Sequence, residues 1–160
     1  MRLDEFNEAD RADAIAVLQP CADIPRWYEA VADDRPYASV EALWAEGMTA
    51  ADPFTADEVE SALAHHPRIG ERPEGDGREA AMSRSEQSGV QPGEALREGN
   101  LAYEERFGRV FLIRAAGRSA DEILAVLNER LTHSPDEEDL VVAGQLREIA
   151  LLRLKGAVTR

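Results

Sequence analysis

The chain has 160 residues, which is enough for one domain with a substantial core and too few for two. Its 32 acidic and 18 basic residues give a formal net charge of -14, so its surface repels nucleic acids and anionic membranes and makes both poor partners. The single cysteine, Cys21, cannot close an intramolecular disulfide, and no apolar stretch reaches the ~20 residues that span a bilayer, so we expect a cytoplasmic protein.

Helix-start signals begin near the N-terminus. Asn7 is predicted to cap a helix over 8–19, and Ser39 is predicted to cap one over 40–48. Trp27 lies in a helical pattern between them and is predicted to be a core residue. The first third of the chain is therefore expected to be helical.

The next helix leads to the stretch "ALAHHPRIGE", residues 62–71, which holds two of the three histidines of the chain. Thr55 and Glu58 have the spacing of a capping box, in which each side chain bonds the backbone of the other, and they predict the start of this helix. Pro67 prevents the helix from continuing. The histidines are therefore expected at its C-terminal end.

His66 is the better candidate of the two histidines for chemistry. It directly precedes Pro67, which pushes its backbone out of the helical region and holds its ring at a corner, where it can exchange a proton near neutral pH. His65 points about 100° away around a helix, so we expect that only one of the two rings faces a given pocket. A plain C-terminal cap is the alternative role for His66.

A metal site is the second alternative for this region. His65, His66, Glu71 and Glu86 are all candidate ligands. Adjacent histidines diverge on a helix, however, and the i, i+4 pair of many zinc sites is missing. The sequence therefore disfavours a metal.

The stretch "SRSEQSG", residues 83–89, is the second candidate for chemistry. Ser83 and Glu86 again have capping-box spacing and predict the start of a helix. A helix N-terminus with a carboxylate and the amide of Gln87 could also bind a polar ligand. Both roles are compatible.

A helix over 92–108 should end at Gly108 in the left-handed conformation. The apolar run after it, 109–117, is predicted to be an extended buried segment between two helices rather than part of a sheet. Arg114 interrupts this run, which favours a buried or pocket-lining position for it.

Capping boxes at Ser119 and Ser134 predict the last two helices. Arg153 lies among leucines on the final helix, where its stem can cover apolar surface and its guanidinium can bind a carboxylate. His133 is expected to be a surface residue. The expected apolar stripe of the final helix is Val142, Leu146, Ile149 and Leu152.

These signals predict an all-α fold, a single domain over 1–160 that is a bundle of seven to nine short helices around one core. Besides an enzyme, the residues leave two functions open. One is a non-enzymatic all-α interaction module that recruits a basic partner. The other is a metal-dependent hydrolase.

The sequence resembles the 2-oxo-4-hydroxy-4-carboxy-5-ureidoimidazoline (OHCU) decarboxylases, which make (S)-allantoin during urate breakdown. The order and spacing of the shared stretches carry the resemblance over nearly the whole chain. These stretches are "RWYEAVADDRPYASVEALWAEG", "ALAHHPRIGE", "SRSEQSGV", "NLAYEERFGRVFLIRAAGRSADEIL", "LNERL" and "REIALLRL".

The resemblance implies an all-helical, cofactor-free homodimer that decarboxylates a small ureidoimidazoline. It makes His66, before the proline, the proton donor and Glu86 its catalytic partner, which orients the imidazole or holds the ureido N–H groups. It makes Arg153 a counter-charge for the substrate anion. It also implies that the substrate contacts Pro67, Ser83, Arg84, Ser85, Gln87, Phe111, Leu112, Ile113, Arg114 and Ala115.

Three positions depart from the family pattern. Arg114 stands where a cysteine is common, His133 where an asparagine is frequent, and Gln145 where an acidic residue is common. We expect these differences to affect fine specificity and not the type of reaction.

Overall fold

The computed structural model describes residues 1–64, 66–70, 77–87 and 93–160, and over these ranges it contains α-helices and no strand. The helices are α1 (Leu3–Glu8), α2 (Arg11–Leu18), α3 (Pro25–Asp33), α4 (Val40–Ala50), α5 (Ala56–Leu63), α6 (Arg78–Glu86), α7 (Glu94–Phe107), α8 (Ala120–Arg130) and α9 (Pro135–Ala157). The all-α prediction is thus confirmed.

Four of the predicted helix starts are confirmed by their side-chain caps. The hydroxyl oxygen of Ser39 accepts a hydrogen bond from a backbone N–H of the first turn of α4. Thr55, Ser119 and Ser134 do the same at α5, α8 and α9, and the glutamate three residues later completes each capping box. Each cap satisfies a backbone donor that has no partner within the helix.

The expected cap at Asn7 is wrong. Asn7 lies inside α1, and the predicted helix over 8–19 is interrupted because Ala9 has an extended backbone (φ -63°, ψ 147°). The side-chain amide of Asn7 instead donates to the carbonyl of Tyr37 and accepts from its N–H, both at 2.9 Å. The side chain that was predicted to be a local helix cap therefore makes a tertiary contact instead.

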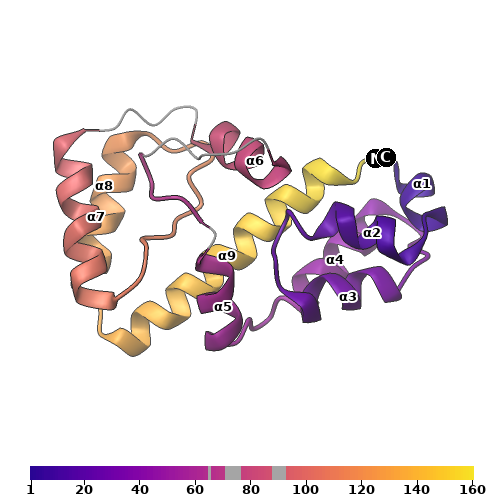
Figure 1. The fold of residues 1–160 in the computed structure, drawn as a ribbon, viewed down its shortest axis with the longest axis horizontal. Coiled ribbons are helices and arrows are strands. Elements are labelled where there is room, and N and C mark those ends of the chain that lie inside the picture. Colours follow the sequence, from indigo (N-terminus) through magenta and orange to yellow (C-terminus); the bar gives the residue numbers. More distant parts are fainter. Residues whose placement is uncertain (65, 71–76, 88–92) are drawn as a thin grey trace.

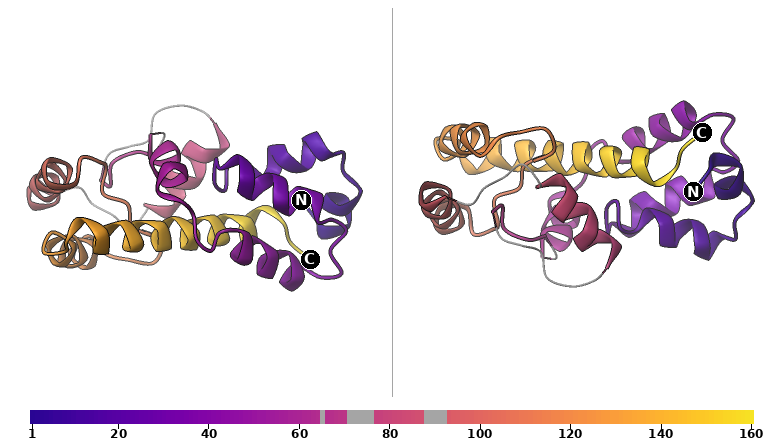
Figure 2. Two further views of the ribbon diagram at one scale, coloured as in Figure 1. Left: turned by 90° about the horizontal axis from the view of Figure 1, so that it is seen from below. Right: turned by 90° about the horizontal axis from the view of Figure 1, so that it is seen from above.

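The long helix α9 connects the two ends of the molecule. Figures 1 and 2 show it running from α7 and α8 at one end to the group of α1–α4 at the other, with α5 and α6 between them. α4, α5 and α2 all pack against α9, and α7 packs against α8. No helix in the described part of the chain combines the length and the apolar character needed to cross a membrane.

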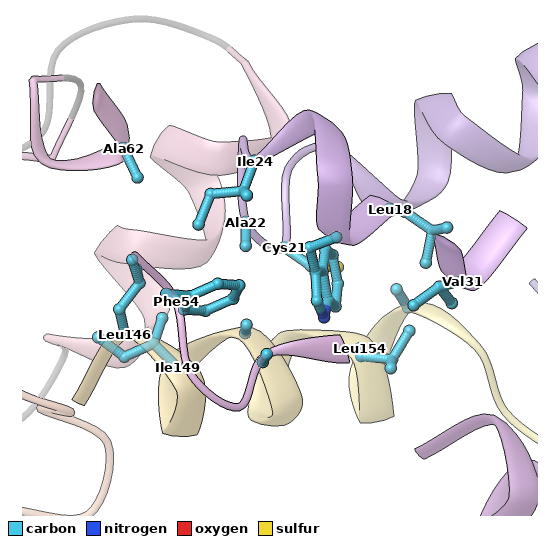
Figure 3. Packing of buried hydrophobic residues seen from close by; sticks show 14 of the residues in the cluster. Leu18, Cys21, Ala22, Ile24, Val31, Phe54, Ala62, Leu146, Ile149 and Leu154 are labelled. Carbon is cyan, nitrogen blue, oxygen red and sulfur yellow. The ribbon is translucent and has the colours of Figure 1, made fainter. Parts of the chain in front are cut away.

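The buried side chains form two clusters, where the sequence predicted one core. The first cluster fills the space between α1–α5 and α9 and includes Trp27, Phe54 and Leu154. Figure 3 shows Phe54, Ile149 and Leu146 packed together in it, which joins the 51–54 connection to α9. Burial of such side chains is the main source of stability in a fold of this kind.

The second cluster lies at the other end of the molecule, between α7, α8 and the segment 109–117. Its members are Ile69, Leu96, Tyr103, Phe111, Ile113, Ala115, Ile123 and Leu127. Leu112, between two of these members, belongs to the first cluster instead. Residues 110–115 lie between two helices and form no strand, as predicted, and their buried side chains belong to both clusters.

The apolar stripe of α9 differs from the prediction at its end. Val142, Leu146 and Ile149 are buried, but Leu152 is 39% exposed. Arg153, four residues after Ile149, continues the buried face instead and is only 4% exposed. The helix therefore carries a charged group into the interior.

Candidate active site

A small cavity lies where four parts of the chain meet, namely the 66–70 segment, the end of α6, the 109–117 segment and α9. Its volume is about 20 Å³, roughly the space that one water molecule needs. Its lining residues are His66, Pro67, Ile69, Ser83, Glu86, Gln87, Phe111, Leu112, Ile113, Ala115, Ile149 and Arg153. Parts of the chain 87 residues apart, from 66 to 153, thus converge on one point.

Most of the residues selected from the sequence line this cavity, and three do not. Arg84 is half-buried and Ser85 is exposed, and both lie outside the lining. The guanidinium of Arg114 turns away to Glu148 and to the carbonyl of Ala116. The lining also includes Ile69 and Ile149, which were not selected from the sequence. An apolar pattern by itself does not distinguish a cavity-lining residue from a core residue.

The interpretation of Ser83 and Glu86 as a helix start is wrong. Both lie in the last turn of α6, which begins five residues before Ser83 and ends at Glu86. Spacing by three residues puts two side chains on one helix face wherever they lie in the helix. Here that face meets Arg153, and neither side chain closes a capping box. Ser83 and Glu86 therefore do not form the polar-ligand site that was expected at a helix N-terminus.

The guanidinium of Arg153 organises one wall of the cavity. Its Nε and Nη2 donate to the two carboxylate oxygens of Glu86 at 2.7 and 3.0 Å. Nη2 also donates to the hydroxyl of Ser83 at 3.0 Å, and Nη1 donates to the carbonyl of Pro20 at 3.2 Å. A two-point arginine–carboxylate pair fixes both position and orientation. Arg153 therefore holds the carboxylate of Glu86 in a set direction.

The imidazole of His66 also lines the cavity and is almost fully buried, with 7% of its side chain exposed. Its Nε2 lies 3.9 Å from a carboxylate oxygen of Glu79, which is also 3.8 Å from Nη1 of Arg153. Glu79 was not selected from the sequence, where nothing set it apart from other helical glutamates. It places a second carboxylate of α6 beside the histidine.

Several side chains fix the backbone that carries His66 and Pro67. The guanidinium of Arg68 donates to both carboxylate oxygens of Glu104 on α7 at 2.6 and 2.8 Å. The amide of Asn100 donates to the carbonyl of Ile69 at 2.8 Å. Gln87 accepts from the N–H of Gly70 at 3.1 Å, so this cavity residue also ties the segment to α6. The corner predicted at Pro67 is thus anchored from α6 and α7.

The 109–117 segment is fixed in the same manner from α8 and α9. The guanidinium of Arg130 donates to the carbonyl of Leu112 at 2.6 Å. The side-chain oxygen of Gln145 accepts from the N–H of Arg114 at 2.9 Å. These two bonds act on the backbone of a segment whose residues Phe111 and Ile113 line the cavity.

A buried ionic cluster stands behind Arg130. Glu138 is fully buried, and one of its oxygens accepts from Nε of Arg130 at 2.7 Å and from the hydroxyl of Tyr103 at 2.6 Å. Its other oxygen lies 2.9 Å from Nδ1 of His133. Burial, together with Glu138, raises the pKa of Tyr103 to about 12. His133 was expected at the surface, but only 24% of its side chain is exposed because it packs onto Glu138.

Cys21 lies near the buried side of Arg153 and takes no part in the cavity. It is 1% exposed, and its thiol donates to the carbonyl of Val17. Burial raises the pKa of the thiol to about 12, although the charge of Arg153 acts in the opposite direction. The thiol therefore stays protonated and unreactive near neutral pH.

The residues considered as metal ligands divide between described and undescribed parts of the chain. His65 and Glu71 lie outside the described residues. Within 1–64, 66–70, 77–87 and 93–160, no three or more His, Cys, Asp or Glu side chains are grouped so that they could hold a metal ion.

A larger cavity of about 470 Å³ lies between α5, the end of α7 and the start of α9. Its charged residues are Glu60, Arg109 and Asp139, and Arg109 donates to Asp139 at its edge. None of the sequence-selected residues lines it. The smaller cavity is the better candidate for chemistry, because a histidine, a carboxylate and an arginine line it and the carboxylate of Glu79 lies close to the histidine and the arginine.

Comparison with known proteins identifies the family of the chain. A family model of OHCU decarboxylases matches residues 7–155. The chain belongs to this family. It is similar to the 2-oxo-4-hydroxy-4-carboxy-5-ureidoimidazoline decarboxylase of Haloferax volcanii, with 30% identity over 158 residues that cover 96% of this chain and 94% of the relative. It is also similar to that of Amia calva, with 32% identity over 136 residues that cover 81% and 78%.

The fold is that of the OHCU decarboxylase family as well. A solved structure of an OHCU decarboxylase in the presence of (S)-allantoin superimposes with a TM-score of 0.69. The match covers 92% of this chain and 97% of that one at 22% identity. The overall helical arrangement is therefore shared with that structure.

Proposed function

We propose that this OHCU decarboxylase family member converts 2-oxo-4-hydroxy-4-carboxy-5-ureidoimidazoline to (S)-allantoin in urate degradation, with His66 as the proton donor. The observation that carries the proposal is that His66, Glu86 and Arg153 line one cavity. Family membership supplies the reaction, a carboxy-lyase reaction. The geometry supports the roles proposed for the residues.

The reaction breaks the bond between the ring carbon and the carboxylate. The electron pair of that bond passes into the conjugated ring as CO2 leaves, and a proton is then added to the ring carbon that bears the ureido group. Addition from one face sets the (S) configuration. General acid or base catalysis of such a step contributes roughly 100-fold to 10,000-fold.

His66 is suited to deliver this proton. Its imidazole is nearly buried at the cavity wall, so the proton reaches the substrate rather than bulk water. The neighbouring carboxylate of Glu79, 3.9 Å away, can stabilise the protonated ring through its charge. The anchored 66–70 backbone keeps the ring on one side of the cavity, which supports delivery to one face.

The contacts of Glu86 support the second of its two expected roles, which is to hold the ureido N–H groups of the substrate. Its carboxylate is held by Arg153 at both oxygens, so Arg153 acts as an orienting group for Glu86 as well as a counter-charge for the substrate. An ionised carboxylate only accepts hydrogen bonds, which suits the ureido N–H groups. Gln87 and Ser83 offer further polar contacts on the same wall.

Substrate binding must widen the cavity. A volume of about 20 Å³ holds about one water molecule, and the ureidoimidazoline is many times larger. The side chains that line the cavity therefore have to move apart when the substrate binds. When these side chains close around the bound substrate, they exclude water from the reaction.

The experiment replaces His66 with Asn in purified protein and supplies freshly made product of urate oxidation. Circular dichroism follows the formation of (S)-allantoin. We expect His66→Asn to lose turnover by roughly 100-fold or more while its far-UV spectrum is retained. Wild-type turnover in this variant would contradict the role of His66.

Two controls make the result specific. His65→Ala, at the neighbouring position outside the described residues, should have a far milder effect. A chelator should leave the wild-type rate unchanged, since a metal-dependent hydrolase would lose activity. If both His66→Asn and Glu86→Gln leave the function of the protein intact, it is an interaction module and not this enzyme.

We also propose that the protein is a homodimer and acts in the cytoplasm. The resemblance to the family supports the dimer, and a single buried thiol suits a reducing compartment. Light scattering coupled to size-exclusion chromatography tests the dimer directly. A mass of one chain at micromolar concentration would contradict it.

A further inference from the structure

The buried cluster behind the 109–117 segment contains charged groups that the proposed chemistry does not use. Arg130 ends α8 and is 3% exposed, and Glu138 in the first turn of α9 is fully buried. We infer that Arg130 is a positioning residue that sets the substrate-binding backbone of the 109–117 segment, with Glu138 holding its guanidinium in place. This inference rests on the proposed function, because it concerns the same cavity.

Arg130 contacts the segment in two ways. Its Nη1 donates to the carbonyl of Leu112 at 2.6 Å. Its guanidinium also lies over the ring of Phe111, with the central carbon 4.5 Å from the ring centre. Both of these residues line the cavity. One side chain therefore fixes the backbone and a neighbouring ring of the same cavity wall.

The segment needs such a contact because residues 110–115 form neither a helix nor a strand. Buried backbone carbonyls must find hydrogen-bond donors, and in a sheet a neighbouring strand supplies them. The described structure contains no strand beside 109–117, and Leu112 is 4% exposed. The guanidinium of Arg130 supplies the donor for its carbonyl.

Glu138 sets the orientation of Arg130. One of its oxygens accepts from Nε of Arg130 and from the hydroxyl of Tyr103, and its other oxygen contacts His133. Groups from α7, α8, α9 and the turn between α8 and α9 therefore meet at one carboxylate. A buried ion pair is seldom a large net source of stability, and its best-attested use is to specify one arrangement over others. Here the specified arrangement is the position of Leu112 and Phe111.

The test is the conservative variant Arg130→Lys. Lysine keeps the charge but has no planar fork, so it cannot bond Glu138 and the carbonyl of Leu112 together. We expect kcat/KM for OHCU, measured well below the melting temperature, to fall by roughly 10-fold to 100-fold, as small misplacements of substrate-contacting groups do. The loss should include a rise in KM, because the displaced backbone binds substrate.

Arg35→Lys is the matched control. Arg35 also bonds backbone carbonyls, those of Ala32, Phe6 and Ala9, and its guanidinium lies 5.3 Å from the ring centre of Phe6. It does so in the α1–α3 region and lines no part of the cavity. Its variant should lower the melting temperature while kcat and KM stay at wild-type values.

A milder variant decides the matter if Arg130→Lys does not fold. Tyr103→Phe removes one donor to Glu138 and keeps the ring, and we expect it to raise KM in the same direction by a smaller factor. Wild-type kcat and KM in the folded variant, whether Arg130→Lys or Tyr103→Phe, would show that the cluster only stabilises the fold and would overturn the inference. A wild-type protein without turnover would instead refute the proposed function.

Discussion

The surroundings of His66, the proposed proton donor, depend on neighbours that are remote in sequence. The sequence places it at a corner before Pro67, and the structure adds Glu79 from α6 beside its ring. The same oxygen of Glu79 also lies 3.8 Å from Nη1 of Arg153, so its carboxylate is close to both the imidazole and the guanidinium. This arrangement gives Glu79 a role that its position in the sequence did not suggest.

We predict that Glu79→Gln lowers kcat by roughly 2-fold to 5-fold and changes KM little. The side chain of Glu79 is 33% exposed, so solvent screens its charge and its contribution is about 1 kcal/mol or less. Steady-state kinetics on folded protein checks this. Glu29→Gln, on the exposed face of α3, is the control and should leave both constants unchanged. An unchanged kcat in Glu79→Gln would mean that the carboxylate does not assist His66.

At the scale of helices, the best-predicted elements are those whose ends are determined locally. Thr55, Ser119 and Ser134 cap their own helices with side chains three residues away, so a short window of sequence contains the whole interaction. Ser83 has the same spacing to Glu86 but is bonded by Arg153, 70 residues later. A short window cannot distinguish these two cases.

The contact between α7 and α8 depends on a glycine. A Cβ atom at Gly99 would lie 2.3 Å from Cδ2 and 3.3 Å from Cγ of Leu127, which is fully buried. We predict that Gly99→Ala destabilises the protein by about 1–3 kcal/mol, since the packed helices must separate or Leu127 must change rotamer. Urea denaturation measures this change.

Gly144→Ala on α9 is the matched control for Gly99→Ala. A Cβ atom there meets nothing within 4 Å, so only the helix preference of alanine over glycine remains. That preference should stabilise the protein by about 0.5–1 kcal/mol. If Gly99→Ala stabilised the protein as Gly144→Ala does, the α7–α8 contact would not depend on the close packing of Gly99 against Leu127.

For the whole molecule, the position of α9 decides how the two buried clusters depend on each other. Val142, Leu146 and Ile149 belong to the first cluster, whereas Glu138 on the same helix is bonded to Arg130 and Tyr103 beside the second. The termini meet at the far end of α9, where Thr159 pairs with the backbone of Met1 and Leu3. A single helix thus supports both clusters.

We predict that the two clusters unfold in one cooperative transition. Loss of the second cluster would leave the buried charge of Glu138 without its partners, and loss of the first would remove the packing of α9. Thermal melting followed by the fluorescence of Trp27 and Trp44, and by near-ultraviolet signals of Tyr103, should give the same midpoint. Two separate midpoints would show that the chain behaves as two domains.

Much of this molecule follows from the sequence alone. Local hydroxyl and carboxylate spacing, apolar periodicity and a proline predicted an all-α fold, most of its helix starts and the corner at His66, because these interactions span only a few residues. The charge balance and the resemblance to a known family directed attention to a small-molecule reaction.

Only the tertiary structure decided which charged groups meet. Three pairings join parts of the chain that are 13 to 67 residues apart and that helix packing brings together. They are Arg153 with Glu86, His66 with Glu79, and Arg130 with the carbonyl of Leu112. Arg114 lies in an apolar run and turns outward, whereas Arg153 lies among leucines and turns inward. Sequence periodicity cannot separate these cases, because the direction of a long side chain is set by the partner that compensates its charge.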